Sequence, residues 1–118
     1  MIVEDDPLNM KLVRTLLELE SYEVIEVVSG EQAVSTAARQ RPDLILMDVQ
    51  LPGIDGLEAC ARLKNDPATA AIPIVALTSY AMPGDEHKAA AAGCSGYITK
   101  PIDTEAFPVL IAGYLGKI

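Results

Sequence analysis

The order of hydrophobic and polar residues along this chain changes repeatedly between two patterns. Short apolar runs bounded by Gly, Pro, Asp or Ser are typical of strands that are buried on both faces of a parallel sheet. Between these runs, apolar residues recur at the spacing of three and four that places them on one face of a helix. The pattern predicts strands at residues 1–4, 22–28, 44–48, 74–77 and 96–99.

Capping residues mark the helices between these strands. Ser and Asp accept hydrogen bonds from the free N–H groups of a first turn, and Asp6, Ser29, Asp55 and Asp103 are placed to do so. The predicted helices span residues 7–19, 30–41, 56–65, 85–92 and 104–115. Pro108 lies just inside the last of them, where we expect it to cost a hydrogen bond or to bend the first turn.

Strands that alternate with helices in this way predict an α/β fold. Such a chain forms a doubly wound parallel sheet with helices on both faces and right-handed crossovers. At 118 residues we expect one domain, residues 1–118. The first strand is shorter than is usual for a central strand, so its pairing is expected to be limited.

Polar side chains follow four of the five predicted strands. Because the carboxyl ends of parallel strands meet at one edge of a sheet, this edge would carry Asp5, Asp6, Asp48, Thr78 and Lys100. Two plainer interpretations stay open at this point. Asp48 is also a suitable cap for the turn that follows it, and Lys100 is also consistent with an ordinary surface lysine.

The chemistry of these side chains points to a phosphoryl site. Three neighbouring carboxylates repel one another unless a cation joins them, and oxygen ligands favour a hard ion such as Mg²⁺, with Mn²⁺ as an alternative. Lys100 and Thr78 would supply an ammonium and a hydroxyl for phosphoryl oxygens. Asp48, in the middle of the edge, is the candidate nucleophile, because carboxylates form aspartyl phosphate in other proteins.

Composition narrows the classes of partner. The chain has 17 acidic and 9 basic residues and a net charge of −8, which argues against direct binding of nucleic acid. No apolar run has the length of a membrane span and no signal peptide is recognisable, so we expect a cytoplasmic protein with no membrane association. Cys60 and Cys94 lack metal or redox spacing and are interpreted as packing residues rather than a disulfide.

At this point the chain resembles the receiver domain of two-component response regulators. The resemblance is carried by VEDD at residues 3–6, DVQLPGIDG at 48–56, ALT at 76–78 and KP at 100–101, and it covers essentially the whole chain. Residues 5–12 and 81–86 further resemble single-domain regulators of the bacterial cell-division and polar-differentiation type, and receivers attached to hybrid kinases.

This resemblance implies a flavodoxin-like (βα)5 fold with sheet order 2-1-3-4-5. It implies that Asp48 accepts a phosphoryl group from a kinase phosphohistidine and that Lys100 pairs with that group. The implied metal ligands are Asp6 and Asp48 directly, the Gln50 backbone carbonyl, and Asp5 mainly through water.

The resemblance also implies a conformational switch. Thr78 would move towards the phosphoryl oxygen and Tyr97 would turn inward with it, which would remodel the face of the last two helices and the strand between them (helix 4, strand 5 and helix 5). The bond between Lys100 and Pro101 would be cis. Tyr97 has a plainer interpretation as a core aromatic, because aromatic residues in strands usually pack there.

Four further residues are assigned smaller roles. We interpret His87, the only histidine, as part of a solvated helix face rather than as a phosphohistidine. Glu4 is expected to contribute to the local electric field more than to metal binding. Gln50 and Tyr80 flank Asp48 and Thr78, and we expect them to limit the access of water and so to tune the lifetime of a phosphoryl group.

The leading hypothesis is therefore a signalling switch that phosphorylates and dephosphorylates its own Asp48 and turns over no outside substrate. Its expected partners are a sensor histidine kinase or histidine phosphotransfer protein and a downstream protein target, with the chain a monomer or weak dimer. A phosphohydrolase is disfavoured because Gln50 occupies the place of a second acid. A flavodoxin-like cofactor binder is disfavoured because acids, and no Gly-rich loop, follow the first strand.

Overall fold

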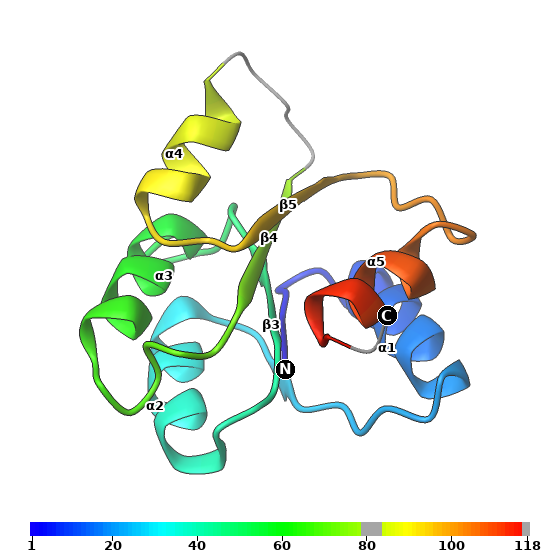
Figure 1. Ribbon diagram of the computed structural model, residues 1–118, viewed down its shortest axis with the longest axis horizontal. Helices are drawn as coiled ribbons and strands as arrows, with labels where there is room; N and C mark the ends of the chain where they lie inside the picture. Colours follow the sequence, from blue (N-terminus) through cyan, green and yellow to red (C-terminus); the bar gives the residue numbers. More distant parts are fainter. Residues whose placement is uncertain (79–83, 117–118) are drawn as a thin grey trace.

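The computed structural model describes residues 1–78 and 84–116 of the chain. Figure 1 shows strands and helices that alternate along the chain. They are β1 (Ile2–Val3), α1 (Pro7–Leu19), β2 (Glu26–Val27), α2 (Gly30–Gln40), β3 (Ile45–Asp48), α3 (Gly56–Asn65), β4 (Ile74–Thr78), α4 (Asp85–Ala91), β5 (Gly96–Thr99) and α5 (Phe107–Tyr114). No helix in the described ranges has both the length and the apolar character needed to cross a membrane.

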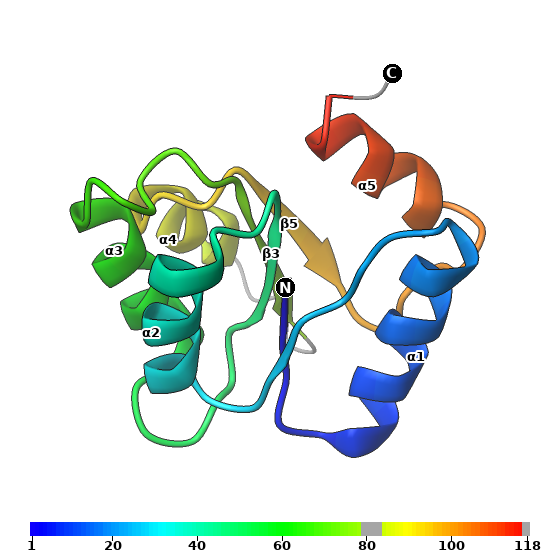
Figure 2. The same ribbon diagram turned by 90° about the horizontal axis from the view of Figure 1, so that it is seen from below.

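The strands form one parallel sheet in the order β2-β1-β3-β4-β5, which confirms the predicted fold class and strand order. Helices α2 and α3 cover one face of the sheet, and α1 and α5 cover the other (Figures 1 and 2). Both faces are therefore buried, and β3 lies at the centre. The register places Asp48 beside Leu77 and Thr78 beside Thr99, so the carboxyl ends of β3, β4 and β5 share one edge.

The core consists of two hydrophobic layers, one on each side of the sheet. Successive strand residues point to opposite faces, so Ile45 and Met47 pack with α2 and α3, whereas Leu46 packs with α1 and α5. All three are almost fully buried. Strands with both faces covered need apolar residues at every position, which is the pattern that the sequence shows.

Strand β2 is shorter than predicted. The sequence pattern predicts a strand over residues 22–28, but only Glu26–Val27 are in the sheet. The physical reason is the partner strand, because β1 offers only Ile2–Val3 for pairing. High β-propensity cannot make a ladder where no neighbouring strand is present.

Helix α5 begins later than predicted, at Phe107 rather than at residue 104. The Asp103 carboxylate accepts hydrogen bonds from the backbone N–H groups of Glu105 and Ala106 at 3.0 and 3.2 Å, in the turn before the helix. Pro108 consequently falls in the first turn of α5. First-turn N–H groups have no partner within the helix, so the expected loss of a hydrogen bond at Pro108 is wrong.

The prediction that Asp103 caps the last helix is wrong, because the N-cap of α5 is Ala106. The three other predicted caps are confirmed. The side chain of Asp6 accepts from the N–H of Leu8 at 2.9 Å, and that of Asp55 accepts from Glu58 at 2.8 Å. Ser29 caps α2 by accepting from Gln32 at 3.2 Å. These local bonds fix where the helices begin relative to the strands that precede them.

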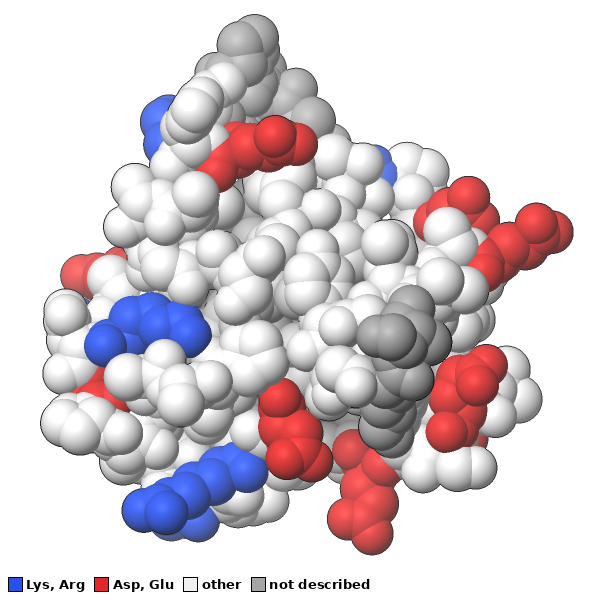
Figure 3. Space-filling view, viewed as in Figure 1, with Lys and Arg blue, Asp and Glu red and all other residues white. Residues whose placement is uncertain are grey.

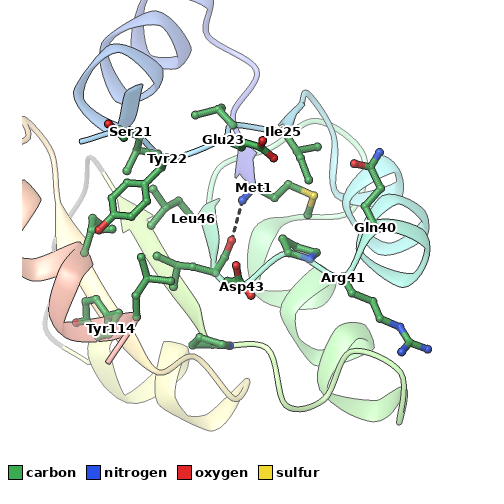
Figure 4. Close-up of a pocket in the computed structure, with 17 residues that line it drawn as sticks. Met1, Ser21, Tyr22, Glu23, Ile25, Gln40, Arg41, Asp43, Leu46 and Tyr114 are labelled. Carbon is green, nitrogen blue, oxygen red and sulfur yellow. Dashed lines mark hydrogen bonds between the residues drawn. The ribbon is translucent and has the colours of Figure 1, made fainter. Parts of the chain in front are cut away.

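A pocket of about 850 Å³ opens at the opposite edge of the sheet, where the strands begin (Figure 4). It lies beside Met1, whose amino group donates a hydrogen bond to the Leu44 carbonyl at 2.7 Å. Burial lowers the pKa of this amine to about 6, against an opposing effect of Asp43. The pocket is located where the two-residue strand β1 begins, and residues that precede β3 and β4 also line it.

Candidate functional site at the carboxyl edge

Asp48 lies at the end of the central strand, held by its neighbours on both sides. The next residue, Val49, continues the pairing with β4 through a bond from its N–H to the Leu77 carbonyl, at 3.0 Å. Asp48 is only 5% exposed, and its Oδ1 accepts from the N–H of Gln50 at 2.9 Å. The second oxygen, Oδ2, accepts from Lys100 Nζ at 3.1 Å.

The loop after Asp48 is compact because Gly56 packs directly on it. A Cβ atom at Gly56 would overlap the Asp48 carbonyl oxygen and approach the backbone of Val49. The Gly56 N–H in turn donates to the Val49 carbonyl at 3.1 Å. Gly56 thus allows α3 to start against Asp48, which explains a glycine immediately after the capping residue Asp55.

Glu4 enters the same site from β1. It follows the last strand residue, and its N–H donates to the Val27 carbonyl at 3.0 Å. Only 1% of its surface is exposed, which is rare for a glutamate without a partner. One carboxylate oxygen, Oε1, accepts from Lys100 Nζ at 2.7 Å, and the other accepts from the Asp6 N–H at 3.3 Å.

Lys100 joins the two buried acids. It follows β5, and its backbone N–H donates to the Thr78 carbonyl at 2.7 Å. Its Nζ lies 2.7 Å from Glu4 Oε1 and 3.1 Å from Asp48 Oδ2, and its side chain is only 10% exposed. The Lys100–Pro101 bond is cis, as the resemblance implied.

The charges in this site do not balance. Burial, and after it the hydrogen bond with Asp48, raise the pKa of Glu4 to about 7 against the opposing effect of Lys100. Burial lowers the pKa of Lys100, but its bonds and charge interactions with Glu4 and Asp48 outweigh this and raise the pKa overall. Asp48 and Glu4 thus compete for one ammonium, so the site favours an additional cation or proton.

A divalent cation fits this arrangement. Among the described residues, Glu4, Asp5 and Asp48 each offer a carboxylate oxygen, and these oxygens lie within 4.8 Å of one another. Carboxylate oxygens are the ligands of hard ions such as Mg²⁺. Three carboxylates against the single ammonium of Lys100 leave two negative charges, which a divalent ion would neutralise.

The cluster differs from the predicted ligand set at one position. The structure brings Glu4, rather than Asp6, together with Asp5 and Asp48. The Asp6 carboxylate instead caps α1, with its oxygens accepting from the Leu8 N–H and from Asn9 Nδ2. The expectation that Glu4 acts mainly through its electric field did not include its direct bond to Lys100 or its place in the carboxylate cluster. Its position immediately after a fully buried strand was the feature of the sequence that indicated burial.

The remaining predicted residues have different positions. Thr78 is buried at the end of β4, on the same edge as Asp48, and Tyr97 is half-buried in β5 beside Ala76. Gln50 is exposed and binds Asp48 through its N–H, which leaves its predicted carbonyl ligand role untested. Tyr80 lies outside the described residues. His87 is exposed on α4, in agreement with a solvated face.

The surface charge on one face is mixed. On the face in Figure 3, acidic and basic side chains are separated by broad uncharged areas, and the acidic ones are found on both sides. The basic side chains on that face do not form a continuous stripe of the kind that follows a phosphate backbone.

Comparison with known proteins matches the chain to one family along nearly its full length. Residues 1–112 match the model of the response regulator receiver domain. The polar-differentiation response regulator DivK of Brucella anthropi is 49% identical over 116 residues, which are 98% of this chain and 94% of that protein. The DivK protein of Brucella ovis shows the same identity and coverage.

Solved structures of similar shape belong to the same family. The receiver domain of the sensor histidine kinase PA1611 from Pseudomonas aeruginosa, with a magnesium ion coordinated in its active site cleft, has a TM-score of 0.90 and 36% identity. That match covers 98% of this chain and 94% of the other. The BeF3-activated receiver domain of Klebsiella pneumoniae RstA has a TM-score of 0.89 and 32% identity, with coverage of 97% and 95%.

Proposed function

This chain belongs to the response regulator receiver domain family, and from that premise we propose that Asp48 accepts a phosphoryl group from a phosphohistidine of a two-component kinase or phosphotransfer protein. The observation that carries the proposal is the convergence of Asp48 and Lys100 on one buried cluster. These residues are 52 positions apart in the chain, yet Lys100 Nζ lies 3.1 Å from Asp48 Oδ2.

The proposed transfer uses the contacts at Asp48 directly. An Asp48 carboxylate oxygen attacks phosphorus, the new O–P bond forms as the P–N bond to histidine breaks, and the imidazole retains the electron pair of that bond. The Gln50 N–H holds Oδ1 at 2.9 Å, so the carboxylate is fixed in orientation before attack. Lys100 is placed to exchange its contact with Asp48 Oδ2 for one with a phosphoryl oxygen.

Glu4, Asp5 and Asp48 would hold the Mg²⁺ ion, and the Gln50 carbonyl remains a predicted fourth contributor. The ion, when bound, neutralises charge on the phosphoryl oxygens. Glu4 has a second role, because its 2.7 Å bond to Lys100 keeps the ammonium at the edge of the sheet. The cluster therefore combines positioning with charge neutralisation, which is what phosphoryl transfer requires.

The response to phosphorylation is proposed to pass through β4 and β5. Thr78 and Tyr97 would rearrange together and alter the face formed by α4, β5 and α5, through which a downstream protein would bind. In this proposal the chain catalyses only the gain and loss of its own phosphoryl group and turns over no outside substrate. Phosphorylation then shifts an existing conformational equilibrium rather than creating a new state.

Labelling with acetyl phosphate tests the acceptor role. With Mg²⁺, we expect the chain to gain one phosphoryl group, in an adduct that hydroxylamine or base removes, and to gain none in Asp48→Asn. Asp43→Asn is the matched control, because Asp43 is an exposed acid at the opposite edge of the sheet. Equal labelling of Asp48→Asn and the unchanged chain would refute the proposal, and rapid multiple turnover of a phosphoester would favour a hydrolase instead.

A further inference from the structure

Two thiols lie in contact on the side of the molecule away from β2. Cys60 is in α3 and Cys94 is in the short segment between α4 and β5, and their Sγ atoms are 3.3 Å apart. These are the only cysteines of the chain, and both are free thiols in the structure. The sequence interpretation as separate packing residues does not account for this contact, which joins positions 34 residues apart.

The surrounding backbone holds both sulfurs in place. The Cys94 N–H donates to the Ala89 carbonyl at 3.0 Å, and the next residue, Ser95, donates to the Ile74 carbonyl at 2.7 Å. Cys60 Sγ also lies 3.4 Å from the Ala92 carbonyl oxygen. Because a disulfide bond is about 2.05 Å long, closing the pair would require a sulfur–sulfur movement of roughly 1.3 Å.

The electrostatic setting suits a reactive pair. The hydrogen bond between the sulfurs lowers the pKa of Cys60, against the effect of burial, and Lys64 one turn further along α3 lowers it too. The same hydrogen bond and burial raise the pKa of Cys94. These opposite shifts favour negative charge on Cys60 and the proton on Cys94. Access to solvent is the reverse, because Cys94 is half-buried and Cys60 is buried.

We propose that Cys60 and Cys94 are a redox modification site, at which a small peroxide closes an intramolecular disulfide between α3 and the segment before β5. In the first step Cys94 passes its proton to the Cys60 sulfur across their 3.3 Å contact and attacks a peroxide oxygen. The O–O bond breaks, and hydroxide leaves and takes up a proton from solvent as water. In the second step the Cys60 sulfur attacks the Cys94 sulfenic acid, the S–O bond breaks, and a second water leaves. Two thiols are oxidised and one peroxide is reduced.

The disulfide would tie the α4–β5 corner to the rest of the sheet. It would link α3 to the segment between α4 and β5, next to the start of β5. The modification does not depend on the proposed phosphoryl-acceptor function, because neither cysteine belongs to the Glu4, Asp5 and Asp48 cluster. An Asp48→Asn variant should close the disulfide in the same way, so the two proposals fail separately.

The test treats the reduced chain with increasing hydrogen peroxide. We expect a monomer whose mass falls by two hydrogen atoms, which has lost both maleimide-reactive thiols in denaturant and recovers them with dithiothreitol. Because the bond restricts the unfolded chain, the oxidised form should melt roughly 5 °C or more above the reduced form. Stepwise addition of oxygen to the wild-type mass, or covalent dimers without an intramolecular disulfide, would overturn the proposal.

Single-cysteine variants distinguish the sulfur that reacts with peroxide from the sulfur that closes the disulfide. Cys60→Ser should stop at a Cys94 sulfenic acid that dimedone traps, because the resolving sulfur is gone. Cys94→Ser should react at least tenfold more slowly than Cys60→Ser, because the remaining sulfur is buried. Equal dimedone labelling of both variants would contradict the proposed order of attack, and the wild-type mass measurement decides the disulfide even if a variant does not fold.

Discussion

The two edges of the sheet treat buried ionisable groups in opposite ways. At the carboxyl edge, Glu4, Asp48 and Lys100 are brought together from β1, β3 and β5 and are nearly inaccessible to solvent. At the amino edge, the acidic residue Asp43 is exposed beside an open pocket. The buried Met1 amine there donates to a backbone carbonyl, and burial lowers its pKa to about 6.

The two edges therefore differ in the charge state that burial favours. The amino edge favours the uncharged form of its buried group, which is the usual response of a protein to burial. The carboxyl edge keeps a buried ammonium between competing carboxylates, an arrangement that costs desolvation energy and is stable only while its charges are paired. A site that retains such a cluster is prepared for a ligand that completes the pairing, such as a divalent cation with a phosphoryl group.

The largest expected effect comes from removing the ammonium of the carboxyl edge. Lys100→Met keeps most of the side-chain volume but leaves Glu4 and Asp48 without their cation. We expect the free energy of unfolding to fall by about 3 kcal/mol at pH 8 without divalent ions. At pH 5 the loss should be smaller, because the raised pKa of Glu4, about 7, lets it bind a proton instead. Urea denaturation at both pH values measures the difference.

Lys11→Met is the matched control, because Lys11 is exposed on α1 and its loss should change stability by less than about 0.5 kcal/mol. Millimolar Mg²⁺ should restore part of the Lys100→Met loss, because the ion supplies the missing positive charge. A loss that is the same at pH 5, at pH 8 and with Mg²⁺ would show that Lys100 stabilises the fold only by packing.

The second prediction concerns the pH dependence that Glu4 creates. Its pKa is raised from 4.5 to about 7 in the folded chain, so between these values the folded state binds more protons than the unfolded state. Stability without divalent ions should therefore fall as pH rises from about 4.5 to about 7, by on the order of 2 kcal/mol from this group. Lys100 does not contribute to the pH dependence of stability in this range, because its pKa is raised from 10.5 and it stays protonated.

Glu4→Gln removes this titration while it keeps the shape of the side chain. The difference between the unfolding free energies of the wild type and Glu4→Gln, measured by urea denaturation from pH 4.5 to pH 8, isolates the contribution of Glu4 from all other groups. Asp6→Asn is the control, because Asp6 caps α1 from an exposed position. A pH slope that disappears in Asp6→Asn and persists in Glu4→Gln would reverse the assignment made from the structure.

The sequence predicts well which residues meet at the carboxyl edge, because the topology of the sheet determines most of their positions. Once strands and helices alternate, the ends of parallel strands must share an edge, and this brings Asp48 and Lys100 together whatever the details of packing. The choice among Glu4, Asp5 and Asp6 is harder. Three consecutive acids follow a strand of two residues, and a shift of one position decides which side chain is buried and which caps α1.

Contacts that depend on packing were beyond the sequence pattern. The length of β2 is set by the residues that β1 offers, and the contact between Cys60 and Cys94 depends on how α3 and the α4–β5 corner approach each other. Neither the length of β2 nor the cysteine contact can be predicted from the periodicity of nearby residues. The late start of α5 is an intermediate case, because the Asp103 cap was recognised but the turn that it closes precedes the helix.

The smallest expected effect belongs to the amino edge and tests whether its charges matter. Arg41 ends α2 beside the pocket with a left-handed backbone, φ 45°, that glycine adopts at less cost. Arg41→Gly should raise the unfolding free energy by roughly 0.5 kcal/mol, because relief of backbone strain slightly exceeds the added freedom of the unfolded chain. In contrast, Arg39→Gly, inside the last turn of α2, should lower it by about 1 kcal/mol. Chemical denaturation of both variants separates the effect of backbone strain on stability from the effect of the lost charge. If Arg41→Gly destabilises the chain as strongly as Lys100→Met, the guanidinium at the amino edge contributes as much to stability as the ammonium at the carboxyl edge. The contrast between the two edges would then be wrong.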